Sequence, residues 1–259
     1  MPHIDLGDMR VHYQLEGGED APVLMFSNSL GTNLTMWEPQ LAACKQHFRV
    51  LRYDTRGHGQ SSVTPGPYTI AQLGRDVLAL LDKLKLELVS FCGLSLGGMI
   101  GQWLGIHAAP RLHKLVLANT AAQIGTVEGW NDRIASVQSH GTRAVIPAVL
   151  DRWYTPNFRV DHQNTVERTR LMLESADPHG YVSCCAAVRD MNQRESVRFI
   201  RVPSLIVTGR FDPVTTPQDG LFLAENIPGA QYVELSAAHL SNVEAADSFT
   251  AHVLKFLAA

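Results

Sequence analysis

Residues 86–108 read LELVSFCGLSLGGMIGQWLGIHA, and this stretch decides the fold. Its first part, Leu86–Cys92, is apolar and rich in strand-favouring residues, and its second part, Gly97–Ala108, has the spacing of a buried helix. The motif Gly93-Leu94-Ser95-Leu96-Gly97 joins the two parts. A serine on so sharp a turn projects its hydroxyl out of the sheet, and small flanking residues let the backbone approach closely. We therefore predict that Ser95 is a nucleophile.

The composition and net charge of the chain are typical of a globular protein and argue against several classes of partner. Of the 259 residues, 45% are hydrophobic and 18% are charged, which is ordinary for a globular protein with a large core. No charged residue occurs from Leu88 to Pro110, but glycines interrupt this run, so we interpret it as a buried strand and helix, not a membrane span. A net charge of −3 offers no concentrated basic surface, and the N-terminus lacks the pattern of a signal peptide. We expect a cytoplasmic monomer or homodimer with neither nucleic acid nor membrane as a partner.

Strand and helix patterns alternate along most of the chain, which is typical of a parallel sheet with helical crossovers. At the beginning, Met9–Leu15 and Val23–Ser27 look like an antiparallel pair of strands. From about Ala121 to Arg194 the pattern is helical and contains no convincing strand. We predict that residues 121–194 form a helical cap inserted into a core of residues 1–120 and 195–259. Such a cap usually covers the carboxyl ends of the strands, where ligands bind in open α/β sheets.

The remaining elements follow from the same periodicities. Further strands are expected at Arg49–Tyr53, Lys114–Ala118, Ser204–Thr208 and Gln231–Leu235. Further helices are expected at Met36–His47, Thr69–Leu84, Trp130–Ser139, Thr142–Tyr154, Asn164–Ser175, Tyr181–Met191 and Ser241–Leu257. Pro147 should kink or break the helix that contains it, because proline removes a backbone donor.

A serine nucleophile needs a base, and the base needs a third group that orients it. Asp212 directly follows one predicted strand, and His239 lies in the loop after the last one. Because the carboxyl ends of parallel strands share one edge of the sheet, both side chains should meet Ser95 there, in the chain order serine, acid, histidine. Asp219 is a poorer candidate for the acid because it falls inside the next helix. His58 precedes the serine, so we assign it to a structural loop near the site.

Acyl transfer also places negative charge on a carbonyl oxygen, and fixed N–H donors must receive it. One donor should be the backbone N–H of Leu96, at the beginning of the helix that follows the serine. The other should come from the polar loop Ser27-Asn28-Ser29-Leu30-Gly31, in which Leu30 is the expected donor.

These features together resemble a known family. The turn around Ser95, the loop Asp54–Ser61, Asp212 and His239 are similar to the α/β-hydrolase fold with a cap domain, over essentially the whole chain. The resemblance implies an α/β protein with a mostly parallel eight-stranded sheet flanked by helices. Within this fold, the chain resembles the 3-oxoadipate enol-lactonases (β-ketoadipate enol-lactone hydrolases) of bacterial aromatic catabolism. The segments that carry this closer resemblance are Ser27–Gly31, Met36-Trp37, Gly93–Met99, Arg152–Pro156 and Thr208–Pro217.

The resemblance implies a five-membered enol-lactone with a carboxymethyl group as substrate. Ser95 would attack the ring carbonyl, His239 would take the serine proton, and Asp212 would hold the imidazole. The Leu30 and Leu96 N–H groups would receive the oxyanion, and water would then release 3-oxoadipate. The implied reaction uses no metal and no organic cofactor. Many relatives carry His-Gly where this chain has Asn28-Ser29, which is a departure from the usual pattern.

The carboxylate of such a substrate must find a partner in the pocket, because an unpaired buried charge is very unfavourable. Arginine suits the planar, bidentate capture of a carboxylate. The candidates in the cap are Arg133, Arg143 and Arg152, with Trp130 and Trp153 as walls. We favour Arg133 and Trp153, and we include Ser29 among the substrate-binding residues.

Two other functions remain open. A broad carboxylesterase or arylesterase of the same fold would have a purely apolar pocket, whereas an arginine that reaches the pocket favours the lactonase. A hydrolase-like receptor for a small lactone would turn over very slowly and would use the cap as a partner-binding surface. A dehalogenase is excluded, because its chemistry needs a carboxylate where Ser95 stands.

Overall fold

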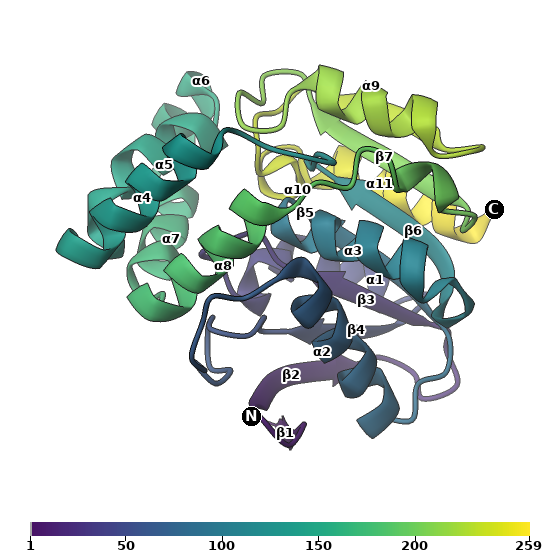
Figure 1. The fold of residues 1–259 in the computed structure, drawn as a ribbon. Helices are drawn as coiled ribbons and strands as arrows, with labels where there is room; N and C mark the ends of the chain where they lie inside the picture. Colours follow the sequence, from purple (N-terminus) through teal and green to yellow (C-terminus); the bar gives the residue numbers. More distant parts are fainter. Residues whose placement is uncertain (1) are drawn as a thin grey trace.

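The computed structural model describes residues 2–259 and contains one eight-stranded sheet (Figure 1). The strands are β1 (His3–Asp5), β2 (Arg10–Glu16), β3 (Val23–Ser27), β4 (Arg49–Tyr53), β5 (Val89–Leu94), β6 (Leu112–Ala118), β7 (Ser204–Gly209) and β8 (Gln231–Leu235). Their order across the sheet is β1-β2-β4-β3-β5-β6-β7-β8. The first two strands run antiparallel to their neighbours, and all others are parallel. This confirms the predicted mostly parallel eight-stranded α/β fold.

One predicted pairing is wrong, because β2 and β3 are not neighbours. Strand β2 pairs antiparallel with β4, and β3 lies between β4 and β5, parallel to both. Burial explains the difference. From Leu24 to Ser27 every residue of β3 is buried, as in a central strand covered on both faces, whereas β2 is largely half-buried. The continuous apolar run Val23–Phe26 therefore indicates an interior position, which a hairpin with β2 at the sheet edge would not provide.

The helices agree broadly with the expected pattern. They are α1 (Glu38–Cys44), α2 (Ile70–Lys83), α3 (Leu96–His107), α4 (Val127–His140), α5 (Ile146–Trp153), α6 (Pro156–Asp161), α7 (Gln163–Glu174), α8 (Pro178–Asp190), α9 (Pro217–Asn226), α10 (Ser241–Glu244) and α11 (Ala246–Ala258). Short 3₁₀ segments are η1 (Leu34–Trp37), η2 (Ala109–Arg111), η3 (Thr142–Ala144) and η4 (Val197–Phe199). The break expected at Pro147 is confirmed, because α5 begins there and η3 precedes it. Strand β1 and helix α6 were not predicted, and the single helix expected over Ser241–Leu257 is divided into α10 and α11.

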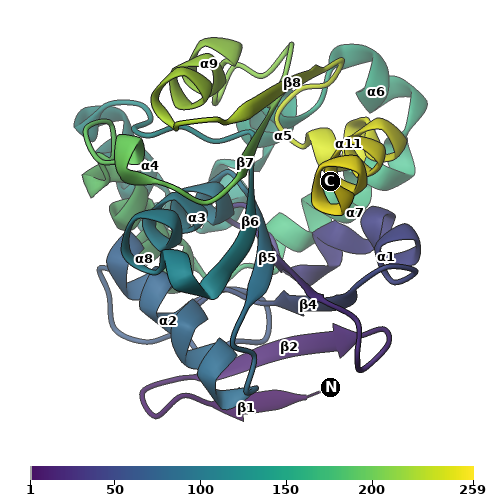
Figure 2. The same cartoon turned by 90° about the vertical axis from the view of Figure 1, so that its right-hand side faces the viewer.

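Helices cover both faces of the sheet (Figure 2), and two apolar clusters hold them there. One cluster lies between the sheet and helices α2, α3 and α9, and the other lies between the sheet and helices α1 and α11. Alternate residues of β5 enter different clusters, so Phe91 packs on one face and Cys92 on the other. Burial of a side chain such as Phe91 contributes about 1.5–3 kcal/mol.

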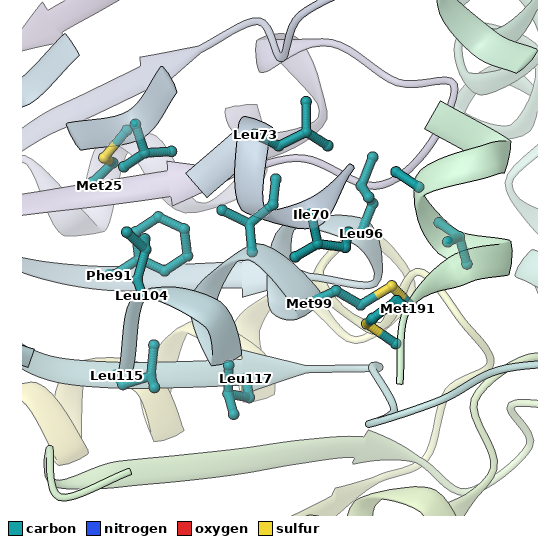
Figure 3. Packing of buried hydrophobic residues seen from close by; sticks show 14 of the residues in the cluster. Met25, Ile70, Leu73, Phe91, Leu96, Met99, Leu104, Leu115, Leu117 and Met191 are labelled. Atoms are coloured by element: carbon teal, nitrogen blue, oxygen red, sulfur yellow. The ribbon is translucent and has the colours of Figure 1, made fainter. Parts of the chain in front are cut away.

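The helices between β6 and β7, here called the cap helices α4 to α8, lie beyond one end of the strands (Figure 1). They are anchored in both apolar clusters: Val188 of α8 joins the first, and Val149 of α5 and Leu173 of α7 join the second. Figure 3 shows the first cluster continuing from Phe91 in the sheet to Met191, just after α8. The cap helices thus share the core with the sheet. Within residues 2–259, no helix has the length and apolar character that crossing a bilayer requires.

Candidate active site

Ser95 occupies a strained turn between β5 and α3. Its φ of +57° and ψ of −112° lie in a region that residues with a side chain rarely adopt. The motif glycines make the turn possible, because a Cβ atom on Gly93 would come within 2.1 Å of the Gly97 carbonyl oxygen. A Cβ atom on Gly97 would come within 2.1 Å of the Ser27 carbonyl oxygen. The turn therefore places Ser95 at the end of a central strand, where the residue is 7% exposed.

The Leu96 N–H group remains available beside this serine. The Ser95 N–H donates to the Ala118 carbonyl oxygen at 3.0 Å, and the Gly97 N–H donates to the Asn28 carbonyl oxygen at 3.0 Å. Leu96 is the first residue of α3, so its N–H has no acceptor within the helix and points along the positive end of the helix dipole.

The loop that carries Leu30 has the same arrangement. The Ser29 N–H donates to the Met36 sulfur at 3.3 Å, and the Gly31 N–H donates to His58 Nε2 at 2.9 Å. Leu30 lies between these two occupied groups. Burial lowers the pKa of His58, which favours the neutral ring that can accept this hydrogen bond. His58 therefore supports the loop that carries Leu30, as expected of a residue in a structural loop near the site.

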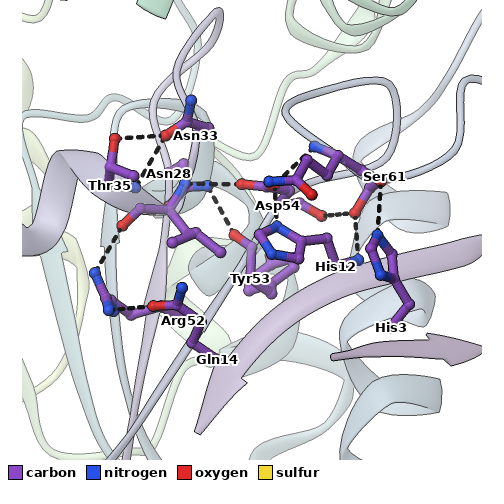
Figure 4. A network of polar contacts seen from close by, with 12 residues as sticks. His3, His12, Gln14, Asn28, Asn33, Thr35, Arg52, Tyr53, Asp54 and Ser61 are labelled. Carbon is purple, nitrogen blue, oxygen red and sulfur yellow. Dashed lines mark hydrogen bonds and ion pairs between the residues drawn. The ribbon is translucent and has the colours of Figure 1, made fainter. Parts of the chain in front are cut away.

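A buried polar network supports this loop from behind (Figure 4). Asp54 accepts a hydrogen bond from the Leu34 N–H at 2.8 Å, and its other oxygen lies 2.6 Å from His12 Nδ1. The Asn28 side chain donates to the Tyr53 carbonyl oxygen at 2.8 Å. The loop that carries Leu30 is therefore fixed by the chain that follows β4, and a fixed donor can stabilise charge without first reorganising.

Asp212 and His239 form a buried pair at the same edge of the sheet. His239 Nδ1 lies 2.8 Å from Asp212 Oδ2, and the two side chains are 2% and 0% exposed. The carboxylate also accepts hydrogen bonds from the Val214 N–H at 2.7 Å, the Thr215 N–H at 3.0 Å and the Thr215 hydroxyl at 2.8 Å. Burial alone would raise the pKa of the Asp212 carboxyl, but His239 and these donors lower it below its ordinary value. Asp212 is therefore ionised and able to orient the imidazole. Asp219 lies apart from this pair and caps α9 with Thr216.

Asn119 supports the same pair and was missed by the sequence analysis. Its side-chain amide donates to Asp212 Oδ2 at 3.0 Å and to the Ala238 carbonyl oxygen at 3.2 Å. It follows β6 directly and has a φ of +41°, which is unusual for a residue other than glycine. The available signal was the polar pair Asn119-Thr120 at a strand end, the same signal that identified Asp212.

Most of the residues predicted to form the site line one small cavity of about 30 Å³. It is lined by Ser29, Leu30, Ser95, Leu96, Met99, Ile124, Trp130, Arg133, Trp153, Val188, Val214 and His239. The Trp153 ring lies against the His239 ring, with 5.9 Å between their centroids. The Ser29 hydroxyl oxygen is buried and has no hydrogen-bond partner among residues 2–259. Because Ser29 also lines the cavity, its hydroxyl is a candidate contact for a ligand there.

A second cavity of about 440 Å³ adjoins the first. The two share Ile124, Trp130, Arg133 and Val214 as a common wall. Across the part of the chain that the structure describes, no group of three or more His, Cys, Asp or Glu side chains is placed to hold a metal ion. The lining of the two cavities instead combines apolar side chains with arginine.

The three candidate arginines differ in position. Arg133 lies in the shared wall, donates from Nε to the Tyr181 hydroxyl at 2.9 Å, and has no carboxylate within ion-pair distance in residues 2–259. Arg152 lines the second cavity but not the one that contains Ser95, and its pKa is lowered by partial burial and by the positive charge of Arg133. Arg143 is largely exposed and pairs with Glu174, away from both cavities. Of the three, Arg133 alone lines the cavity that contains Ser95.

Known proteins share this architecture. Residues 22–246 match the family described as alpha/beta hydrolase fold. The chain is 44% identical over 242 residues to 3-oxoadipate enol-lactonase 2 of Acinetobacter baylyi, which covers 93% of this chain and 91% of that protein. The crystal structure of the enol-lactonase from Burkholderia xenovorans LB400 has a TM-score of 0.98 and 44% identity over 100% of both chains. A thermophilic esterase from Thermogutta terrifontis has a TM-score of 0.90 at 25% identity, over 96% of this chain and 93% of that one. This chain is therefore a member of the α/β-hydrolase fold family and a relative of the 3-oxoadipate enol-lactonases.

Proposed function

We propose that this hydrolase opens 3-oxoadipate enol-lactone to 3-oxoadipate, using Ser95, His239 and Asp212 under a cap formed by residues 121–194. The observation that carries the proposal is the position of Arg133 in the wall of the cavity that contains Ser95, where this arginine has no acidic partner among residues 2–259. The similarity to two enol-lactonases of Acinetobacter baylyi, at 44% and 42% identity, supports the choice of lactone.

The first half of the reaction forms an acyl-enzyme. Ser95 Oγ attacks the ring carbonyl carbon while His239 Nε2 takes the hydroxyl proton, and Asp212 stabilises the resulting imidazolium. The Leu30 and Leu96 N–H groups receive the oxyanion. They are free to do so, whereas the N–H groups of the residues directly before and after them already donate hydrogen bonds within the protein. The ring carbon–oxygen bond then breaks, and the leaving oxygen takes the proton from His239 to become an enol. The enol tautomerises to a ketone, which makes ring opening strongly downhill.

The second half releases the product. Water attacks the acyl carbon as His239 takes one of its protons, and the same two N–H groups receive the second oxyanion. The Ser95 oxygen leaves and regains the proton from His239, which restores the starting state. The new carboxyl group loses its proton to solvent at neutral pH, and the product is 3-oxoadipate.

Arg133 would hold the substrate carboxylate during both steps. The guanidinium lies 5.3 Å from the centroid of the Trp130 ring and 5.5 Å from that of Tyr181, so its plane is supported on aromatic faces. Arg133 donates to the neutral Tyr181 hydroxyl, and the remaining N–H groups of its guanidinium are left to bind a carboxylate. With the ring at Ser95 and the carboxylate at Arg133, the substrate would extend across the wall shared by the two cavities. The Ser29 hydroxyl would supply a further hydrogen bond, and Trp153 would form an apolar wall.

The test compares two substrates with the unmodified enzyme. We expect kcat on the enol-lactone of roughly ten per second or more, the median for enzymes. We also expect kcat/KM on this lactone to exceed that on phenyl acetate, a neutral ester, by at least about 100-fold, the effect of one good charged contact. A preference for phenyl acetate would identify a broad esterase. Turnover far below one per second on both substrates would indicate a receptor.

A further inference from the structure

The half-buried carboxylate of Glu244 links two segments that are distant in the sequence. Glu244 lies at the end of α10, close after His239. Its Oε2 accepts a hydrogen bond from the Ala238 N–H at 2.8 Å. Its Oε1 accepts from the Thr155 N–H at 3.2 Å and also from the Thr155 hydroxyl. Thr155 belongs to the cap helices, where it caps the beginning of α6, so one carboxylate joins the cap to the loop that carries His239.

A second contact strengthens the same junction. The Leu240 N–H donates to the Trp153 carbonyl oxygen at 3.1 Å. The residues on both sides of His239 are therefore linked to one short cap segment, Trp153–Thr155. Leu240 bonds to this segment directly, and Ala238 is linked to it through the Glu244 carboxylate. The Trp153 ring also lies against the imidazole, at 5.9 Å between centroids. The position of His239 depends on this cap segment as well as on Asp212.

We propose that Glu244 is a positioning residue for the reaction, which holds the His239 imidazole in line with Ser95 by fixing its loop to the cap segment. Glu244 does not line the cavity that contains Ser95, so it acts through His239 and not on the substrate. The inference rests on the proposed roles of Ser95 and His239, but it does not depend on which ester is the substrate.

The chemistry of the junction requires a carboxylate of this length. Three donors converge on Glu244: the Ala238 N–H, the Thr155 N–H and the Thr155 hydroxyl. Two acceptor oxygens can satisfy them, whereas glutamine has one acceptor oxygen and presents an NH₂ group to an N–H donor. Aspartate keeps the charge but is one methylene shorter, so it reaches one of the two segments at most. A shift of about 1 Å in a catalytic group can lower turnover by about 100-fold, so loss of this junction should be visible in kcat.

The experiment measures kcat and KM on phenyl acetate, because a neutral ester reports on His239 without involving the substrate carboxylate. We expect Glu244→Ala to lower kcat by about 10- to 100-fold with KM within about twofold of the unmodified enzyme. Glu244→Gln should lower kcat by about 3- to 10-fold, because it keeps one of the two links. The matched control is Glu225→Gln, an exposed glutamate on α9, which should leave both constants unchanged.

A spectroscopic measurement separates positioning from a general loss of structure. The proton that His239 Nδ1 shares with Asp212 should give a far-downfield NMR resonance in the unmodified enzyme, as imidazole protons bonded to a carboxylate do. We expect this resonance to shift or broaden in Glu244→Ala while the rest of the spectrum remains that of the folded protein. A lower kcat with an unchanged resonance would mean that Glu244 acts elsewhere and would overturn the inference.

Two further outcomes decide the remaining cases. If Glu244→Ala does not fold, Glu244→Gln becomes the deciding variant, and a kcat within about twofold of the unmodified enzyme would overturn the inference.

Thr155→Val removes one of the donors, so combining it with Glu244→Ala should add little to the effect of Glu244→Ala alone. Fully additive effects would contradict a shared junction. Retained activity in Ser95→Ala would instead refute the proposed function, whatever the Glu244 variants do.

Discussion

The core side and the cap side of the cavity that contains Ser95 differ in how their polar groups are hydrogen-bonded. On the core side, the Asp212 carboxylate accepts five hydrogen bonds, from Val214, Thr215, Asn119 and His239. On the cap side, Arg133 has a neutral hydroxyl as its hydrogen-bond partner and two aromatic rings beneath it. The Asp212 carboxylate is fully hydrogen-bonded without a substrate, whereas the Arg133 guanidinium retains unused donors.

Under the proposed function, this difference separates the groups that carry out the reaction from the group that recognises the substrate. Groups that stabilise a transition state act best when they are fixed in advance, because no reorganisation is then needed during the reaction. A group that recognises a carboxylate needs free donors, because a donor already bound to an acidic side chain would have to be released first. The comparison predicts that changes at Asp212 and its donors will lower kcat for every ester, and that changes at Arg133 will act on anionic substrates alone.

The largest effect is expected for Ser95→Ala. We expect kcat to fall by at least about 10,000-fold on both the enol-lactone and phenyl acetate, since the nucleophile is lost and the remaining groups supply only residual rate enhancement. The measurement is a spectrophotometric lactone-opening assay, with the exposed Ser248→Ala as the control. Most activity remaining in Ser95→Ala would refute nucleophilic catalysis at this position.

Arg133→Met tests the cap side. It should lower kcat/KM on the enol-lactone by about 100-fold, because the substrate carboxylate would lose its charged partner in a partly desolvated site. On phenyl acetate, kcat/KM should change by less than about twofold, since that ester has no carboxylate. Arg143→Met is the matched control, because Arg143 is largely exposed and pairs with Glu174. Equal losses on both substrates would show that Arg133 supports the fold and does not select the substrate.

Asn119→Ala tests the support behind the core side. It removes one donor to Asp212 and the bond to the Ala238 carbonyl oxygen. We expect kcat to fall by about 10-fold on both substrates and stability to fall by about 1–3 kcal/mol, because buried acceptors lose a partner. Steady-state kinetics and urea unfolding measure the two effects. An effect on the lactone alone would place Asn119 with the recognition groups.

Ser29→Ala should have a smaller effect and sharpens the comparison. Ser29 belongs to the core side by position, but its hydroxyl has no partner among residues 2–259, as expected of a recognition group. We expect kcat/KM on the enol-lactone to fall by about 3-fold, with stability within about 0.5 kcal/mol of the unmodified protein because no internal hydrogen bond is lost. A clear loss of stability without a kinetic effect would assign this hydroxyl to the fold.

The smallest effect concerns pH and stability. Burial lowers the pKa of His58 below its ordinary value of 6.5, so the folded protein binds fewer protons at this site than the unfolded chain does. The associated stability is fully present above about pH 6.5 and is lost as the pH falls through the folded pKa, when protonation removes the acceptor for the Gly31 N–H. Asp212 has a lowered pKa as well, and its contribution is lost at more acidic pH, below its ordinary value of 3.8. Urea unfolding of His58→Gln between pH 5 and pH 7.5 should show a weaker pH dependence than the unmodified protein, and an identical dependence would contradict this account.

The sequence was sufficient to locate groups that have titratable or nucleophilic side chains at strand ends. Ser95, Asp212 and His239 follow β5, β7 and β8, and the structure brings all three to one edge of the sheet. Asn119 follows β6 in the same way, but an uncharged amide at a strand end is also common in ordinary turns. Glu244 shows a different limit, because its two partners lie 6 and 89 residues away and only the folded chain brings them together.

The elements of the fold could be predicted where a continuous run of apolar residues marks a buried strand or helix. The order of the strands in the sheet was harder to predict, because it depends on which strands pair with each other. The parallel strands from β4 onwards could be placed from their apolar runs, and the break at Pro147 followed from the chemistry of proline. The pairing of β2 with β3 was predicted wrongly because a short polar turn suggested a hairpin, whereas β3 is buried on both faces and lies inside the sheet. Local patterns indicate how deeply a strand is buried, but they do not identify its neighbours.

The place where the cap helices enter the chain has a consequence for how this scaffold can diversify. The chain leaves the sheet at the end of β6 and returns at β7, and these two strands are adjacent, with Ala118 opposite Val207. A lid of another length or sequence could therefore be grafted between them without altering a single strand register. Such a lid would have to fill the places that Val149, Leu173 and Val188 now take in the two apolar clusters, and to anchor the loop that carries His239. Within these two constraints, substrate specificity could change by exchange of the lid while the sheet and the strand-end residues stay the same.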